Sequence, residues 1–294
     1  MSNPELIPSR DLGQERANPM IWEGEEQAEG VFLDTGEALD LLGVPALQVP
    51  PEPRLPLDYT PGPDLRAALA VLRHTLASAA AGEVDKRRID VTALQPQSRQ
   101  ALLEMLGEGE VSGSVVLDAI RYTVSESVLP GVWRVAGSDD TEWLEVGPVP
   151  AVITDAAGSL RAAPVTLPPP GPGIMNGLAV LAEISEHAAA WDDTAPANRV
   201  LNFTLLPMSP EDQQLLIDVL GRAELVLDSG GFGNCRIMAT HVRYVWAVQY
   251  VNAMGNTILD TIEVGRIPEA AVAASQDLQD SARRLDEILD TYLS

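Results

Sequence analysis

Hydrophobic periodicity along the chain predicts helices that alternate with short strands. Four leucines recur at helical spacing, so we expect a helix over residues 64–82 with Asp64 as its N-cap. The apolar residues of 174–191 and of 267–293 also follow a helical pattern, which predicts an amphipathic helix and a long terminal helix. The four leucines are Leu65, Leu69, Leu72 and Leu76.

Alternation of apolar and polar residues predicts strands elsewhere, most clearly over 242–250. Trp246 and Val248 share one face of this strand with other apolar residues, whereas Ala247 falls on the opposite face. We expect the first face to lie in the core and the second to be partly solvated. Residues 254–256 separate this strand from the next apolar run, so an antiparallel hairpin is predicted there.

The same order of elements occurs twice along the chain. A strand, a helix and a series of strand-like runs are predicted over 87–150 and again over 199–268. Five markers recur in the same order in the two segments, which indicates a divergent internal repeat. The pairs are Pro96 with Pro210, Leu106-Gly107 with Leu220-Gly221, Glu110 with Glu224, Trp133 with Trp246, and Glu145-Val146-Gly147 with Glu263-Val264-Gly265.

The predicted fold class is α+β, with two tandem divergent copies of a strand-helix-antiparallel-sheet module, each followed by a helix. Residues 1–63 are predicted to form a flexible, acidic and proline-rich N-terminal extension, because prolines deny ladder hydrogen bonds. The first repeat and its preceding helix are placed at 64–163. A Pro/Gly linker follows at 164–173, and the second repeat with its flanking helices occupies 174–294.

Charge and composition narrow the functional classes. A formal net charge of −24 argues against nucleic-acid partners, whose non-specific binding requires clustered Lys and Arg. The charge favours solubility, or alternatively an acidic face that recruits a basic segment. The N-terminus lacks an apolar signal core, and no run of about 18 apolar residues could span a bilayer. With a single cysteine that excludes intramolecular disulfides, the sequence predicts a cytoplasmic protein without membrane insertion.

Candidate chemistry centres on Cys235, the only cysteine of the chain. His241 is six residues away, and on one continuous strand the two side chains would share a face but lie roughly 20 Å apart. We therefore favour a non-catalytic cysteine that is packed or exposed to a partner. The three histidines form no zinc motif, and carboxylates are too abundant for one acid-base pair to be singled out. No catalytic, cofactor-binding or metal-binding residue is predicted.

Trp133 and Trp246 occupy matching positions in the two copies. One interpretation makes both indoles equivalent core anchors of the two modules. In the other, one end of each indole reaches a partner groove, because tryptophan is enriched at binding hot spots.

Several segments resemble signature blocks of the HupH/HyaF/HoxQ family of nickel-iron hydrogenase expression proteins. The resemblance covers roughly residues 85–293 and keeps the order of the blocks. An additional match is the stretch LDTGEALDLL in the N-terminal region. The blocks are GEGEVS, ESVLPGVWRV, LNFTLLPMSPED, GFGNCRI and VWAVQYVN.

This resemblance implies a non-catalytic, chaperone-like assembly factor in hydrogenase maturation. The implied partners are the immature iron-sulfur small subunit, bound before Tat export, and a thioredoxin-like accessory protein. Trp133, Cys235 and Trp246 are the candidate partner contacts. An alternative is a redox or metal-handling accessory protein that uses Cys235, and a third hypothesis is a structural scaffold or homo-oligomer.

Overall fold

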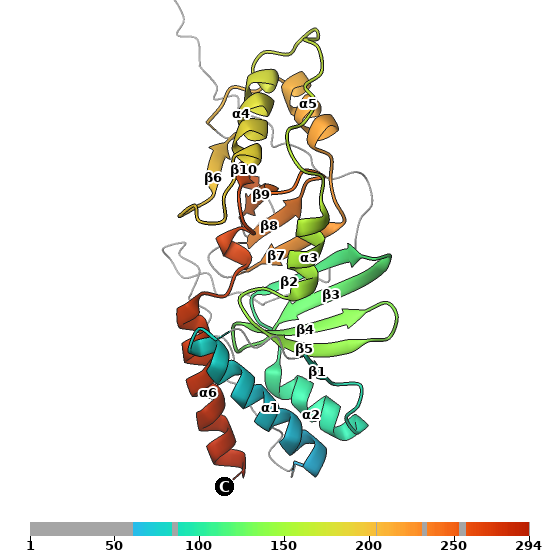
Figure 1. Cartoon of the computed structure of the whole chain (residues 1–294), viewed down its shortest axis with the longest axis vertical. Coiled ribbons are helices and arrows are strands. Elements are labelled where there is room, and N and C mark those ends of the chain that lie inside the picture. Colours follow the sequence, from blue (N-terminus) through green and yellow to red (C-terminus); the bar gives the residue numbers. More distant parts are fainter. Residues whose placement is uncertain (1–60, 84–87, 204, 231–233, 253–256, 294) are drawn as a thin grey trace, which may run out of the picture.

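A computed structural model describes the chain over residues 61–83, 88–203, 205–230, 234–252 and 257–293 (Figure 1). Within these ranges the fold is α+β, as predicted, with one ten-stranded antiparallel sheet. Almost all of the expected N-terminal extension and the tip of the predicted hairpin lie outside the described residues. The helices that the structure describes are too short or too polar to cross a membrane.

The sheet joins two sets of five strands side by side. The strands are β1 (Arg88–Asp90), β2 (Val111–Leu117), β3 (Ile120–Glu126), β4 (Val132–Gly137), β5 (Glu142–Val146), β6 (Arg199–Asn202), β7 (Leu225–Ser229), β8 (Asn234–Ala239), β9 (Val245–Val251) and β10 (Thr257–Val264). Their order is β1-β5-β4-β3-β2-β7-β8-β9-β10-β6. The two sets meet where β2 pairs with β7.

Helices cover the two ends of the sheet. They are α1 (Pro63–Ala80), α2 (Pro96–Leu106), α3 (Ala151–Ser159), α4 (Gly177–Ala189), α5 (Pro210–Leu220), the 3₁₀ helix η1 (Glu269–Ala271) and α6 (Ser275–Leu293). Helices α1, α2 and α6 gather at one end of the molecule, and α4 and α5 lie at the other (Figure 1). Helix α3 packs on the central strands β2 and β7.

Local sequence explains how α5 begins. Ser209 Oγ accepts a hydrogen bond from Asp212 N at 3.0 Å, and the Asp212 carboxylate accepts one from Ser209 N at 3.0 Å. This capping box satisfies backbone donors that a helix start leaves unpaired. Pro210 occupies the first helical position, as the sequence predicts.

Helix α1 begins one residue earlier than predicted, and Asp64 is not its N-cap. Gly62 holds the N-cap position, and Pro63 opens the helix because its missing N–H would have no partner there. The Asp64 carboxylate instead accepts hydrogen bonds from Gln95 N at 2.9 Å and Ser98 Oγ at 2.9 Å. It thereby ties the start of α1 to the start of α2.

The segment 234–252 forms two strands, β8 and β9, rather than one continuous strand. A turn separates them, in which the Thr240 hydroxyl group accepts a hydrogen bond from Val242 N. Both faces of β9 are buried, which corrects the expectation of a partly solvated face: Trp246 packs on one side of the sheet and Ala247 on the other. The face that carries Ala247 is buried because α4 and α5 cover it.

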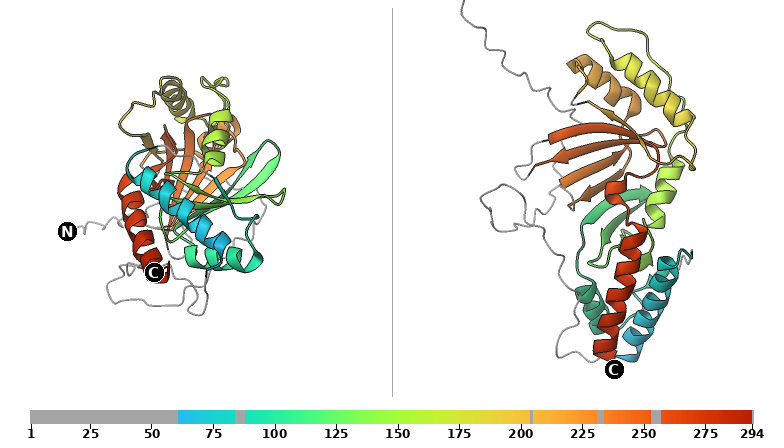
Figure 2. Two further views of the ribbon diagram at one scale, coloured as in Figure 1. Left: turned by 60° about the horizontal axis from the view of Figure 1, so that its bottom comes forward. Right: turned by 90° about the vertical axis from the view of Figure 1, so that its left-hand side faces the viewer.

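The predicted terminal helix is interrupted after η1. Helix α6 starts afresh at Ser275, and the Asp277 carboxylate accepts a hydrogen bond from Ala274 N at 2.8 Å. Its buried residues Leu278, Leu285 and Leu289 share a core with the leucines of α1. The C-terminal helix therefore returns to the first half of the molecule and lies beside α1 (Figure 2).

Three apolar clusters stabilise this arrangement. One lies between α1, α2, α6 and strands β1, β4 and β5, and another lies between α4, α5 and strands β8, β9 and β10. The third cluster covers the opposite face of the sheet, under α3 and η1, and draws residues from both sets of strands. Burial of this shared apolar surface holds the two sets together.

Candidate functional site

The three sequence-predicted contact residues all belong to the third apolar cluster, but Trp133 on β4 and Trp246 on β9 are separated by four strands of the sheet. Trp133 is 1% exposed, Trp246 is 2% exposed and Cys235 is 3% exposed. Each indole N–H donates to a glycine carbonyl, Trp133 to Gly147 at 2.9 Å and Trp246 to Gly265 at 3.2 Å. Their role as partner contacts stays a prediction, and the folded chain presents almost none of these side chains at its surface.

The environment of Cys235 disfavours a reactive thiolate. The pKa of the thiol is raised from 9.0 to about 12, mainly by burial and also by the nearby carboxylates of Glu263 and Asp228, while the hydrogen bond to Tyr250 opposes this effect. A thiol with this pKa stays protonated at neutral pH, whereas nucleophilic attack and metal binding require the thiolate. The hypothesis of a redox or metal-handling thiol stays untested, but the geometry gives it no support.

His241 lies apart from Cys235, at the far end of β8. Its backbone N–H donates to Leu220 O at 2.9 Å, and its ring packs against Gly221, where α5 ends. A side chain at Gly221 would collide with this imidazole. Over the part of the chain that the structure describes, no three His, Cys, Asp or Glu side chains are grouped to hold a metal ion.

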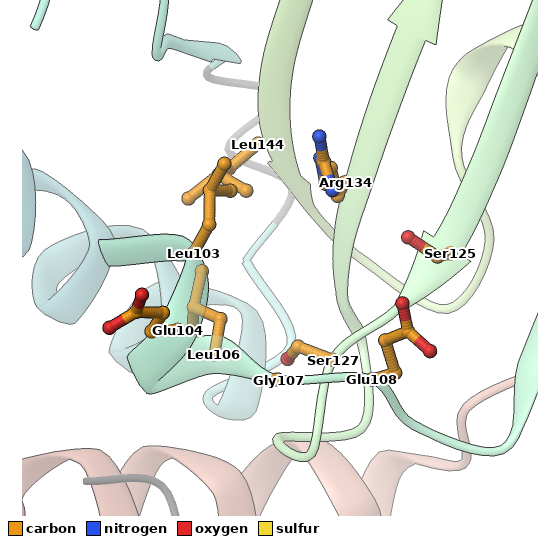
Figure 3. Close-up of a pocket in the computed structure, with 9 residues that line it drawn as sticks. All are labelled: Leu103, Glu104, Leu106, Gly107, Glu108, Ser125, Ser127, Arg134 and Leu144. Atoms are coloured by element: carbon orange, nitrogen blue, oxygen red, sulfur yellow. The ribbon is translucent and has the colours of Figure 1, made fainter. Parts of the chain in front are cut away.

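The main candidate site is a cavity of about 280 Å³ between α2 and the first half of the sheet (Figure 3). Leucines from α2 and β5 form its apolar part, while carboxylates, hydroxyl groups and one guanidinium supply the polar part. The lining residues are Leu103, Glu104, Leu106, Gly107, Glu108, Ser125, Ser127, Arg134 and Leu144.

A sharp exit from α2 shapes the mouth of this cavity. Gly107 ends the helix with a φ of +52°, and a Cβ there would lie 3.1 Å from a Val128 methyl group. Val128 N donates to Leu106 O at 2.9 Å, and Gly109 N donates to Glu126 O at 2.7 Å. These bonds bring the segments GEGEVS and ESVLPGVWRV together, although the sequence separates them.

Arg134, which lines the cavity, belongs to an ion-pair network. The Glu142 carboxylate is buried and bonds with the guanidinium groups of both Arg99 and Arg134. The other carboxylates that line the cavity, Glu104 and Glu108, are exposed to solvent. The mouth therefore combines an apolar floor with an acidic rim.

A second buried carboxyl group lies near this site, on the other face of β3. Glu126 accepts a hydrogen bond from Gly131 N at 2.9 Å. Its pKa is raised from 4.5 to about 7, mainly by burial and also by the carboxylates of Glu110 and Asp277, whereas the Gly131 hydrogen bond opposes this effect. Asp277 belongs to α6, so the start of the terminal helix approaches the same end of the strands.

Sequence reasoning did not find this cavity. Its carboxylates are among many in the chain, and Ser125 gives no signal as a single small residue in a strand. A detectable signal is the contrast between the two sets of strands: Ser125 on β3 and Met238 on β8 occupy matching register positions, next to the partners of Trp133 and Trp246. Reading that contrast requires the strand register, which periodicity alone does not supply.

Comparisons with known proteins agree with the resemblance of the sequence blocks. The family model described as HupH hydrogenase expression protein, C-terminal conserved region, matches residues 174–292. A solved structure of the hydrogenase expression protein HupH from Thiobacillus denitrificans is 26% identical, with a TM-score of 0.35; the match covers 40% of this chain and 97% of that chain.

Matches to similar relatives cover most of this chain and most of each relative. Hydrogenase expression/formation protein HupH of Rhizobium leguminosarum is 39% identical over 78% of this chain and 80% of its own length. HoxQ of Cupriavidus necator is 42% identical over 69% of this chain and 72% of its own. Hydrogenase-1 operon protein HyaF of Escherichia coli is 32% identical over 77% of this chain and 80% of its own. The chain therefore belongs to the family of hydrogenase expression/formation proteins that includes HupH, HoxQ and HyaF.

Proposed function

We propose that this protein is a non-catalytic assembly factor in nickel-iron hydrogenase maturation. The observation that carries the proposal is the similarity, over more than three quarters of the chain, to a protein named for hydrogenase expression and formation. Its specific client is the immature iron-sulfur small subunit, which it binds in the cytoplasm before Tat export. A thioredoxin-like accessory protein acts beside it.

The cavity under α2 supports a binding role. An apolar floor flanked by carboxylates offers a partner both buried contact area and charge complementarity. The ion pair between Arg134 and Glu142 fixes the wall in place without the partner. In contrast, Cys235 lies in the core with a thiol whose pKa is raised, which favours a structural role for this residue.

We further propose that the two sets of strands derive from one duplicated unit. The two sets have matching strand orders from the outer edge of the sheet to its centre, namely β1-β5-β4-β3-β2 and β6-β10-β9-β8-β7. In each set the edge strand is followed along the chain by a helix, α2 after β1 and α5 after β6. In both units a residue with positive φ precedes the tryptophan strand, Gly131 at +85° and Tyr244 at +69°. Their carbonyls accept from Gly147 N and Gly265 N.

The proposed boundaries follow the sequence prediction: an extension at 1–63, units at 64–163 and 174–294, and a linker at 164–173. The return of α6 to α1 then links the end of the second unit to the core of the first. Such a link favours one cooperative body over two independent modules.

The test is affinity purification of the tagged full-length chain from cells that express the hydrogenase operon. Mass spectrometry of the bound proteins should identify the unprocessed small subunit, at an amount that falls as salt rises. An unrelated acidic protein with the same tag controls for nonspecific charge binding. Recovery of no hydrogenase component after mild crosslinking would contradict the proposal.

A further inference from the structure

The cavity under α2 follows one row of side chains across three paired strands. Ser125 on β3 is the register partner of Arg134 on β4, and Arg134 is the partner of Leu144 on β5. Leu144 is buried, whereas Ser125 is partly exposed and half of the Arg134 side chain is accessible. This row therefore leaves space below the helix.

The corresponding row in the second set of strands leaves no such space. Met238 on β8 is the register partner of Ala247 on β9, and Ala247 is the partner of Ile262 on β10. All three side chains are at most 1% exposed and pack in a cluster with Leu216 and Leu220 of α5. Met238 thus occupies the place that Ser125 leaves open in the first set.

The backbone around the two rows has the same connections. Val128 N donates to the last carbonyl of α2, Leu106 O, and His241 N donates to the last carbonyl of α5, Leu220 O, each at 2.9 Å. Since helix end and strand register match, the cavity results from the side chains themselves. Ser125 is smaller than methionine, and the Arg134 guanidinium turns aside to Glu142.

We propose that this cavity receives one apolar side chain of methionine or leucine size from a basic segment of the partner protein. The inference rests on the proposed function, because the segment belongs to the client that the protein binds. A volume of about 280 Å³ far exceeds the roughly 30 Å³ of one water molecule, so a side chain can enter.

The chemistry of the lining selects this occupant. Leu103, Leu106 and Leu144 provide apolar contacts that favour an aliphatic side chain over a charged one. Glu104 and Glu108 at the mouth lie where residues flanking that side chain would pass, and they favour lysine or arginine there. The acidic net charge of the chain steers such a segment toward the protein.

The test is the substitution Ser125→Met, which should fill the cavity with a side chain of the protein itself. Methionine is the residue at the matching position of the second row, Met238. Binding of purified variants to the immobilised, unprocessed hydrogenase small subunit is measured by surface plasmon resonance, and thermal unfolding is measured in parallel. We expect the affinity to fall at least tenfold while the unfolding midpoint stays at or above that of the wild type. The control is Thr123→Met, an exposed position on the same face of β3 outside the cavity, which should bind as the wild type does.

A second readout keeps the proposal testable if Ser125→Met lowers stability. A photo-crosslinking amino acid at Leu103 should join the chain to the small subunit, at a segment with an apolar residue beside basic ones, whereas the same amino acid in place of Thr123 should not. Unchanged affinity of a stable Ser125→Met variant, or crosslinking only from position 123, would overturn the cavity assignment and leave the proposed function intact. Failure of the wild type itself to bind the small subunit would overturn both.

Discussion

Glu126 is a buried carboxyl group whose protonation is coupled to folding. Its pKa is about 7 in the folded chain, against 4.5 for the ordinary group. Between these values the folded state binds more protons than the unfolded state, so the free energy of unfolding falls as pH rises from about 4.5 to about 7. Well above pH 7 Glu126 is ionised in both states, and the cost of burying its charge lowers the free energy of unfolding by a constant amount.

Replacing Glu126 by Gln is therefore expected to stabilise the protein at alkaline pH. The amide keeps an acceptor for Gly131 N and removes the charge, so the free energy of unfolding should rise by up to about 3 kcal/mol at pH 8. The gain should narrow as pH is lowered to about 5.5. Urea titrations at both pH values measure this difference.

The matched control is Glu186→Gln on the exposed face of α4. A surface charge of this kind should change the free energy of unfolding by less than about 0.5 kcal/mol at either pH. A gain in Glu126→Gln that is the same at both pH values would contradict the coupling and indicate a packing effect instead.

At the scale of elements, the contact of β2 with β7 joins the two sets of strands. Gly113 on β2 allows their close approach, because a Cβ there would lie 2.2 Å from Val226 O and 3.0 Å from the Leu227 Cα. These are backbone atoms of the partner strand, which cannot rotate away. The joint therefore depends on the absence of a side chain at this position.

The substitution Gly113→Ala should lower the free energy of unfolding by about 1–3 kcal/mol, the usual range for overpacking. The control Gly158→Ala places a methyl group on α3, where no atom lies within 4 Å, and should raise stability by up to about 1 kcal/mol. Chemical denaturation of both variants measures the contrast. Equal stability of the two variants would show that β2 and β7 can move apart without cost.

Sequence patterns located most elements because their signals are local. Proline at the first turn and glycine past the last turn mark α2 and α5, and period-two alternation marks the strands. The break between β8 and β9 was not predicted, since the turn depends on the Thr240 hydroxyl group and on the pairing of both strands. Periodicity carries no such information.

The return of α6 to α1 was also beyond local patterns. The apolar face that includes Leu278 and Leu285 is visible in the sequence, but the partner of that face is not. The contact between α6 and the β3–β4 turn requires a glycine at position 131, because a Cβ there would lie 2.3 Å from a Leu278 methyl group. Ser281 Oγ donates to the neighbouring Pro130 O at 2.9 Å, so the terminal helix is anchored on the β3–β4 turn.

At the scale of the whole molecule, charge and shape have different roles in the proposed binding of a basic segment. The net charge of −24 attracts a basic segment over distances of about one Debye length, roughly 8 Å at physiological salt. In the proposed complex the rim carboxylates Glu104 and Glu108 would orient the segment, and the leucine floor would retain it. Loss of the rim charges should therefore slow association more than it speeds dissociation.

The double variant Glu104→Gln/Glu108→Gln tests whether the rim charges act mainly on the association rate. Its affinity for the unprocessed small subunit should be roughly three- to tenfold below that of the wild type at low salt, mainly through the association rate. The difference in affinity between the variant and the wild type should shrink as salt rises. Salt screens the attraction between the rim carboxylates and the basic segment, and the variant already lacks this attraction. Glu186→Gln/Glu211→Gln, which removes two exposed charges from α4 and α5, has the same net charge and serves as the control. Equal slowing in both double variants would mean that total charge, and not the rim of this cavity, directs the partner.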